Sequence, residues 1–351
     1  MFTNSRWKLV ATAIAAVGIT ALAGCASNSN AAGGSTPPSS STSSAAPTSA
    51  QSPTSEAGTT GAATSGSAAP ASSEATSGSA SPSGSASAPG ASVDAASLVP
   101  ADIKAKGTLT VATDATYAPN EFVKPGSNDI VGLDPDLAVA LGQQLGLKLN
   151  MVNASFDTII PGLQSGKYDM GLSAYTDTKE REKVVDFVVY YQTGESFFIK
   201  ADSTKTYAGL DSLCGAKVSV ETGTTEEADA NTQSDACTKA GKSKVDVLSF
   251  ADQNAANLAV SSGRADLGFA DTQVVGYMLT QSNGQFKETG DPVNVTPSGI
   301  ALPKGNGMAA AVQAALQNLI ADGTYDKIFK QWGMDTNEIG ASDIKINAAI
   351  S

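Results

Sequence analysis

The chain has 351 residues, and its 34 acidic against 22 basic residues give a formal net charge of −12 at pH 7, which argues against a nucleic-acid partner. It contains no histidine and only three cysteines, which excludes Ser-His-Asp catalysis, Cys-His catalysis, imidazole metal ligands and a four-thiolate zinc site. The composition therefore favours a binding protein without metal or cofactor over an enzyme.

The first 25 residues predict export. Arg6 and Lys8 precede an uncharged apolar stretch at 9–22, which is too short to span about 30 Å of hydrocarbon as a helix. The stretch ends in LAGC at 22–25, which resembles the lipobox of bacterial lipoproteins. The resemblance implies that 1–24 is a signal peptide and that lipid on Cys25 anchors the protein. An ordinary signal peptide followed by a chance cysteine is the alternative.

Residues 25–97 then form a low-complexity segment, composed almost entirely of Ser, Ala, Thr, Gly and Pro after Cys25. Such a segment buries too little apolar surface to offset its conformational entropy. It predicts a disordered tether that holds a folded part away from the membrane.

The remaining residues, 98–351, alternate strand and helix patterns. Strands are expected at 108–113, 147–152, 169–173, 217–220, 245–250 and 265–270. Helices are expected at 134–145 with Asp134 as N-cap and Gly146 as the stop, after Ser155, after Thr178, at 226–237, at 252–262 and twice within 303–332. This alternation predicts an α/β fold with mainly parallel sheets covered by helices.

A similarity between two segments of the chain indicates two similar lobes. QSGKYDMG at 164–171 is similar to SSGRADLG at 261–268, and each has the pattern of a helix end, a glycine turn and a buried strand. Convergence of such junctions is the alternative. If each lobe has its own sheet, a ligand would bind beyond the strand ends, near Ala174 and Asp271.

Several short motifs follow one another in the folded part. They are TDATYAPNEF at 113–122, GLDPDL at 132–137, FDTIIPGL at 156–163, TDTKER at 176–181, VDF at 185–187, GTT at 223–225 and RAD at 264–266. This ordered set resembles family 3 of the extracellular solute-binding proteins, which serve amino-acid ABC importers. The resemblance covers about 103–332.

The resemblance implies a two-lobed fold of the type II periplasmic-binding-protein class, with a ligand cleft between the lobes. Two hinge strands would cross between them, near 196–200 and 298–302. Lobe 1 would then consist of 98–200 plus 298–351, and lobe 2 of 201–297.

The resemblance also implies a site for both charged groups of a free amino acid. Arg181 would bind the α-carboxylate through its planar fork, assisted by Thr176. Asp271 would receive the α-ammonium beside the backbone carbonyl of Ala174. The alternatives are a surface arginine for Arg181 and a helix N-cap for Asp271.

Four further positions complete the expected site. Thr224 and Thr225 stand at a strand-to-helix turn, where free N–H groups favour an anion, although both could simply be caps. Phe156 and Tyr117 would sandwich the ligand side chain, with core packing as the alternative for Phe156.

Three polar residues bear on specificity. Asn120 stands where the family usually has an aromatic residue, so one wall of the pocket would be polar. Asp114 aligns with an acid that meets polar or basic side-chain ends in relatives, and Asp177 would add a second negative group. Together they favour a polar or basic amino acid, since an acidic side chain would be repelled.

Cys214 and Cys237 remain once Cys25 carries lipid. Outside the cytoplasm a disulfide is the default expectation, and two buried free thiols are the alternative. The bridge would enclose residues 223–225.

We therefore expect a monomeric, lipid-anchored substrate-binding component of an ABC importer. It would lie on the extracellular face of the bacterial cytoplasmic membrane or in the periplasm, with the membrane lipid, an ABC permease and a small-molecule amino acid as partners. Two other classes stay open. One is a dehydratase- or lyase-type enzyme on the same scaffold, with Glu121 and Glu195 as loose acid-base candidates. The other is a ligand-sensing partner of a membrane receptor.

Overall fold

The computed structural model describes residues 93–350, so the expected signal peptide, Cys25 and most of the expected linker lie outside the described residues. The strands are β1 (Thr108–Thr113), β2 (Thr116–Tyr117), β3 (Glu121–Val123), β4 (Ile130–Val131), β5 (Lys148–Asn153), β6 (Met170–Gly171), β7 (Val185–Lys200), β8 (Lys217–Glu221), β9 (Asp246–Phe250), β10 (Leu267–Asp271) and β11 (Phe286–Pro303). The helices are α1 (Ala101–Lys106), α2 (Leu133–Leu145), α3 (Phe156–Gln164), α4 (Lys179–Glu182), α5 (Thr225–Lys239), α6 (Gln253–Ser261), α7 (Thr272–Gln281), α8 (Ala309–Ala321) and α9 (Thr324–Gln331). Within residues 93–350, no helix is both long enough and apolar enough to cross a bilayer.

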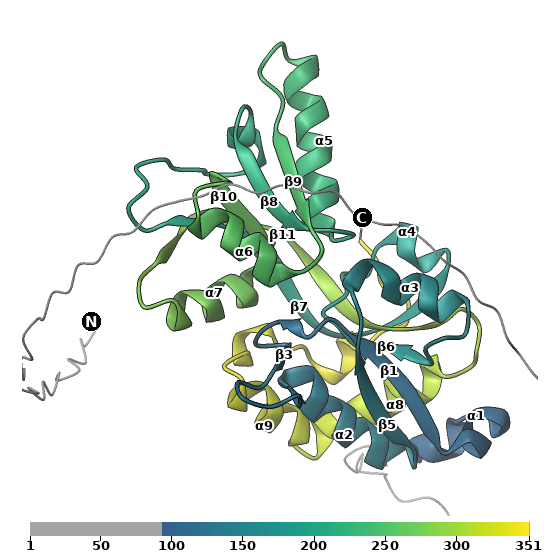
Figure 1. Ribbon diagram of the computed structural model, residues 1–351. Coiled ribbons are helices and arrows are strands. Elements are labelled where there is room, and N and C mark those ends of the chain that lie inside the picture. The colour runs from purple at the N-terminus through teal and green to yellow at the C-terminus, as the bar shows by residue number, and fades with distance from the viewer. Residues whose placement is uncertain (1–92, 351) are drawn as a thin grey trace, which may run out of the picture. The chain divides into compact units, whose positions relative to one another are not determined.

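An eight-stranded sheet runs through both lobes in the order β5-β1-β6-β11-β7-β10-β8-β9, and β2, β3 and β4 form a small second sheet (Figure 1). The expectation of a separate sheet in each lobe is wrong. β7 and β11 pair with each other from Lys200↔Phe286 to Val185↔Pro303, with register shifts on the way. Because β7 also pairs with β10, and β11 with β6, the two long strands join the halves into one sheet. The lobe boundaries given above stay a prediction.

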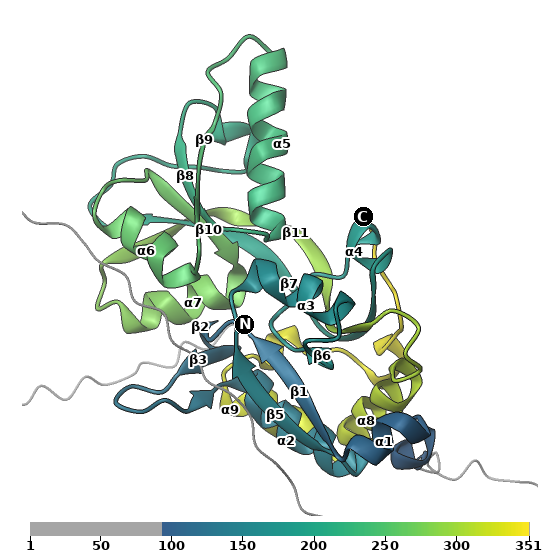
Figure 2. The same cartoon turned by 45° about the vertical axis from the view of Figure 1, so that its right-hand side comes forward.

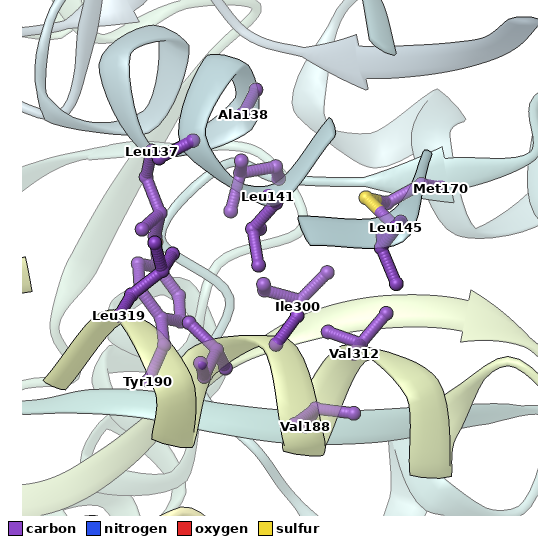
Figure 3. Packing of buried hydrophobic residues seen from close by; sticks show 14 of the residues in the cluster. Leu137, Ala138, Leu141, Leu145, Met170, Val188, Tyr190, Ile300, Val312 and Leu319 are labelled. Atoms are coloured by element: carbon purple, nitrogen blue, oxygen red, sulfur yellow. The ribbon is translucent and has the colours of Figure 1, made fainter. Parts of the chain in front are cut away.

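The core of lobe 1 lies between the sheet and the helices α2, α8 and α9. Leu137 and Leu141 of α2 meet Ile300 of β11 and Val312 of α8 (Figure 3). A second cluster, which includes Ile159 of α3, covers the other face of the same strands. The sheet of lobe 1 is thus buried on both faces, as parallel strands require.

Lobe 2 repeats this arrangement with different helices. Phe197, Val218 and Phe269 pack on the side of α5, whereas Phe198 and the residues of α6 and α7 pack on the other side. Figure 2 shows α5 on one side of β8 and β10, and α6 and α7 on the other. Because helices cover both faces, we expect a ligand site at the carboxyl ends of the parallel strands.

Local signals placed most helix ends correctly. Thr178 caps α4 with its side chain as expected, and Ser155 stands at the N-cap position of α3, although its side chain makes no capping hydrogen bond. Asp252, which was expected as the first residue of a helix, is the N-cap of α6, and Gly146 ends α2 with a positive φ of 65° as expected. The start of α2 was predicted wrongly: its N-cap is Gly132, so Asp134 lies inside the helix. A side chain at residue 132 would place its Cβ 2.1 Å from the carbonyl oxygen of Asn120, and this close approach selects glycine there.

Candidate functional site

A small cavity of about 10 Å³ lies between the two lobes. Its lining comes from Tyr117, Phe156, Ala174, Thr176 and Arg181 on one side and from Thr224, Thr225, Glu226 and Asp271 on the other. The structure thus brings together all the expected ligand-binding residues except Asp114 and Asn120. A larger groove near Tyr277 and Trp332 has no charged side chain in its lining, so it does not suit a zwitterion.

Arg181 bridges the two lobes at this cavity. Thr178 caps α4 by accepting the N–H of Arg181, which fixes the residue at the helix start. Its guanidinium donates from Nη1 to the carbonyl of Thr176 (2.8 Å) and from Nη2 to the carbonyl of Gly223 (2.9 Å). A guanidinium has five N–H donors, so the others stay available for a ligand. Burial lowers the pKa of Arg181, while Tyr175 and the nearby carboxylates oppose this effect.

Two stacked rings form the floor under this guanidinium. The rings of Phe156 and Tyr175 stack with centroids 4.3 Å apart, and Cζ of Arg181 lies 5.6 Å and 5.3 Å from them. The Tyr175 hydroxyl donates to the carbonyl of Phe156 at 2.8 Å. Tyr175 was not singled out from the sequence, because a lone tyrosine beside the TDTKER motif carries no distinguishing signal. Tyr117 lies elsewhere in the lining, where its hydroxyl accepts the N–H of Asp271 from the opposite lobe (3.2 Å).

Two carboxyl groups of lobe 2 enter the cavity opposite Arg181. Asp271 and Glu226 are 4% and 3% exposed, and Asp271 stands before α7 without capping it. Burial raises the pKa of Asp271 well above its usual range, and Glu226 adds to the shift. Burial also raises the pKa of Glu226 to about 7, against the opposing charge of Arg181. Within residues 93–350, Oε1 of Glu226 has no hydrogen-bond partner.

Sequence reasoning missed Glu226. An acidic residue in the first turn of a helix is ordinary, since it complements the helix dipole, and this reading hid its inward position. The two threonines before it behave differently from each other. The Thr224 hydroxyl accepts the N–H of Glu227 and donates to the carbonyl of Glu221, so it caps α5. The Thr225 hydroxyl instead lies 3.3 Å from that of Thr176, across the lobe boundary.

Ala174 has an unusual backbone for a residue with a side chain. Its φ is +51°, in the left-handed region. Such strain persists only where the surroundings enforce it and is frequent at binding sites. Asp134, which was expected to be a cap, is instead buried within α2, and its carboxylate accepts the Tyr190 hydroxyl at 2.9 Å.

Asp114 lies beside the cavity, whereas Asn120 and Asp177 are directed elsewhere. Asp114 accepts the Thr116 hydroxyl (2.7 Å) and the N–H of Phe156 (3.0 Å). The Asn120 amide is engaged by Tyr191 and Gln273, so the structure gives no polar wall at this residue. Asp177 accepts the N–H of Ala348 at 2.8 Å, and its carboxylate therefore holds the C-terminal segment and does not charge the cavity.

The disulfide between Cys214 and Cys237 is present, with the two Cα atoms 5.6 Å apart. It ties the segment before β8 to α5, so the loop at 223–225 is enclosed as expected. The N–H of Gly223 in this loop is held by Glu227 at 2.7 Å.

Comparison with known proteins identifies relatives. Residues 109–335 match the family described as bacterial extracellular solute-binding proteins, family 3. An arginine-binding protein of Corynebacterium glutamicum is 31% identical over 68% of this chain and 78% of its own length. An arginine-binding protein of an Escherichia coli ABC transporter is 34% identical over 64% of this chain and 90% of its own. The solved structure of an ancestral arginine-binding protein with arginine bound has a TM-score of 0.59 and 36% identity, and the match covers 64% of this chain and 98% of that one. All three are named as binding proteins, in agreement with the expectation for this chain.

Proposed function

Because this chain belongs to family 3 of the bacterial extracellular solute-binding proteins, we propose that it captures a free amino acid with a basic side chain and delivers it to an ABC permease. The main support for this proposal is the position of the Arg181 guanidinium. This group joins the two lobes at Thr176 and Gly223 and faces two buried carboxyl groups across a small cavity. An α-carboxylate would pair with Arg181, and an α-ammonium with Asp271 and the carbonyl of Ala174.

The charge of the site supports a basic ligand. Among the residues that the structure describes, 93–350, Arg181 is the only cation in the lining, against the carboxyl groups of Asp271 and Glu226. Asp114 accepts the N–H of Phe156, which is one of the lining residues. Burial raises the pKa of these carboxyl groups, so without a cation beside them they tend to hold protons. A neutral zwitterion brings one charge of each sign, whereas a second positive charge on the ligand side chain would favour their ionised form and pair with it. The arginine-binding relatives agree with this preference.

A thermal-shift screen of the full chain against the twenty amino acids tests the proposal. Ligand at 100 times its Kd adds about 2.7 kcal/mol to the free energy of unfolding, so a true ligand stands out by its rise in Tm. We expect the largest rise with arginine or lysine. Agmatine, which is arginine without its carboxylate, should give almost none. A rise with agmatine equal to that with arginine would overturn the pairing of Arg181 with the α-carboxylate.

We further propose that Cys25 carries the lipid that holds the protein at the extracellular face of the cytoplasmic membrane. The LAGC sequence at 22–25 and the low-complexity segment that follows it support this location. The segment would let a monomeric binding part reach the permease while tethered.

A further inference from the structure

A buried glutamine, Gln273, connects the two lobes beside the cavity. It is the second residue of α7 and is 9% exposed. Its Nε2 lies 3.1 Å from Oδ1 of Asn120, 3.2 Å from the Tyr191 hydroxyl and 3.3 Å from Oδ2 of Asp271. Its Oε1 accepts the hydroxyl of Thr193. Both ends of the amide are therefore held, and the side chain reaches from a lining residue of the cavity to the loop between β2 and β3.

Asp271 is held in place by this glutamine and by lobe 1. It stands at the N-cap position of α7, but its side chain makes no capping hydrogen bond. Its carboxylate instead accepts from Gln273, and its N–H donates to the Tyr117 hydroxyl at 3.2 Å. Burial raises the pKa of Asp271 well above its usual range, and the bond from Gln273 acts against this shift. An N–H donor favours the ionised carboxylate, which is the form that pairs with an ammonium.

Asn120 is the partner of Gln273 in lobe 1. Its side chain is fully buried, and its Nδ2 lies 3.3 Å from the Tyr191 hydroxyl. The side chains of Asn120, Tyr191 and Gln273 thus bond to one another in pairs. A buried amide without a partner is costly, and these two amides can satisfy each other only while the lobes are together. The contact between Asn120 and Gln273 therefore depends on how the lobes meet.

We propose that Gln273 is a positioning residue, which orients the Asp271 carboxylate toward the α-ammonium of the ligand and, through Asn120, makes that orientation depend on closure of the lobes. Pairing of the ammonium with Asp271 and contact between the lobes then stabilise each other. This inference rests on the proposed function and adds to it the residue that prepares the ammonium site.

Calorimetry with arginine and guanidinovalerate, which is arginine without its α-ammonium, tests the inference. The full chain should be compared with Gln273→Met, which removes the amide, and with Gln281→Met as a matched control at an exposed glutamine of the same helix. The ratio of the guanidinovalerate Kd to the arginine Kd should fall about tenfold in Gln273→Met, because a hydrogen bond to a charged group is lost. It should stay unchanged in Gln281→Met. A side chain that only supported the fold would weaken both ligands equally and leave the ratio as it is.

Asn120→Ala tests the same link from lobe 1, since it removes the partner of Gln273 and leaves Asp271 and Gln273 themselves in place. The ratio should fall here too, and the double change should lower it by less than the product of the two single effects. If the wild type prefers arginine and either variant keeps the full ratio, Gln273 does not position Asp271, while the proposed function stands. If the wild type binds both ligands equally, the α-ammonium is not recognised, and the proposed pairing with Asp271 fails together with this inference.

Discussion

At the scale of single residues, Arg181 is the side chain on which the site depends most. Its fork reaches carbonyls of both lobes and still has donors for a ligand. A lysine at this position would keep the charge and lose the planar fork. One residue therefore determines both how an anion is held and how the lobes meet.

We expect Arg181→Lys to weaken arginine binding by at least about tenfold and Arg181→Ala by two to three decades, or roughly 3–4 kcal/mol, because a buried carboxylate is left without its partner. Calorimetry gives both values. Arg264→Lys is the control, since Arg264 is exposed and only lies over the ring of Phe250. Equal affinities for wild type and Arg181→Ala would contradict the assigned role.

The raised pKa of Glu226 leads us to expect that the stability of the unliganded protein depends on pH. Burial raises the pKa of Glu226 from 4.5 to about 7 in the folded state, so the folded protein binds a proton more tightly there than the unfolded chain. Its stabilising contribution is present below pH 4.5 and is lost as the pH rises through about 7. Burial raises the pKa of Asp177 to about 7 and that of Asp134 to about 6, and both act in the same direction.

Urea unfolding at pH 5 and pH 8 measures this dependence. The wild type should lose stability between the two, and Glu226→Gln should lose less by up to about 3 kcal/mol. Glu180→Gln, at a glutamate whose side chain is 81% exposed, should behave as the wild type. Identical slopes for wild type and Glu226→Gln would show that Glu226 ionises freely in the folded protein.

The sequence was informative where a residue type is rare and stands in a motif, as with Arg181 in TDTKER. It was uninformative for Glu226 and Gln273. A glutamate or glutamine in the first turn of a helix looks like a solvated residue, and only the packing of the opposite lobe buries it. The prediction that Asp134 is an N-cap was wrong for a similar reason. Its sequence context is typical of a cap, but its carboxylate is buried and accepts the Tyr190 hydroxyl.

At the scale of elements, the turn between β8 and α5 brings the lobes into contact. Gly223 has a φ of +85°, and a Cβ there would lie 3.0 Å from Cβ of Asp157 in the opposite lobe. Gly223→Ala should therefore hinder closure and weaken ligand binding by about tenfold or more, beyond the loss of roughly 1 kcal/mol in stability from backbone strain. Affinity and urea unfolding should be measured on the same preparation.

Gly263→Ala provides the matched control. Gly263 has a similar φ of +77° but no atom within 4 Å of its would-be Cβ. The two variants should lose similar stability, and only Gly223→Ala should lose affinity. Equal affinities would show that the approach of Gly223 to Asp157 does not limit closure.

The disulfide between Cys214 and Cys237 is expected to stabilise the folded protein. Replacing Cys214 and Cys237 together by serine removes a link across 23 positions and should lower the free energy of unfolding by about 3 kcal/mol. Chemical unfolding of the oxidised and the reduced wild type should differ by a similar amount. No difference between them would mean that the bridge does not constrain the unfolded chain.

Helices and strands were predicted well because their signals are local. Thr178, for example, caps α4 by accepting the N–H of Arg181, three residues further along the chain. Strand pairing is not local, and for this reason the single sheet was not predicted. Lys200 pairs with Phe286, and the 85 residues between them must fold back before this pair can form.

At the scale of the whole molecule, the expected lipid anchor predicts where the protein is found. Cys25→Ala removes the thiol that would accept lipid, so the variant should pass from the membrane fraction into the medium or the periplasmic fraction. Cys214→Ser, which leaves Cys25 in place, is the control and should stay with the membrane. A cleaved Cys25→Ala protein that still sediments with membranes would contradict the anchor.

The position of β11 has a consequence for how the molecule is made. β11 is the last strand of the large sheet to be synthesised, yet it lies at the centre, between β6 and β7. Before it emerges, β8, β9 and β10 can already pair with one another and with β7, whereas β6 has only β1 beside it. The strands of lobe 2 can thus pair with one another before synthesis ends. The sheet of lobe 1 cannot be completed until β11, near the C-terminus, has been made. Until then two inner strands expose open edges, which are templates for aggregation, so a chain that stops short of residue 286 is the form of this protein most in need of a chaperone.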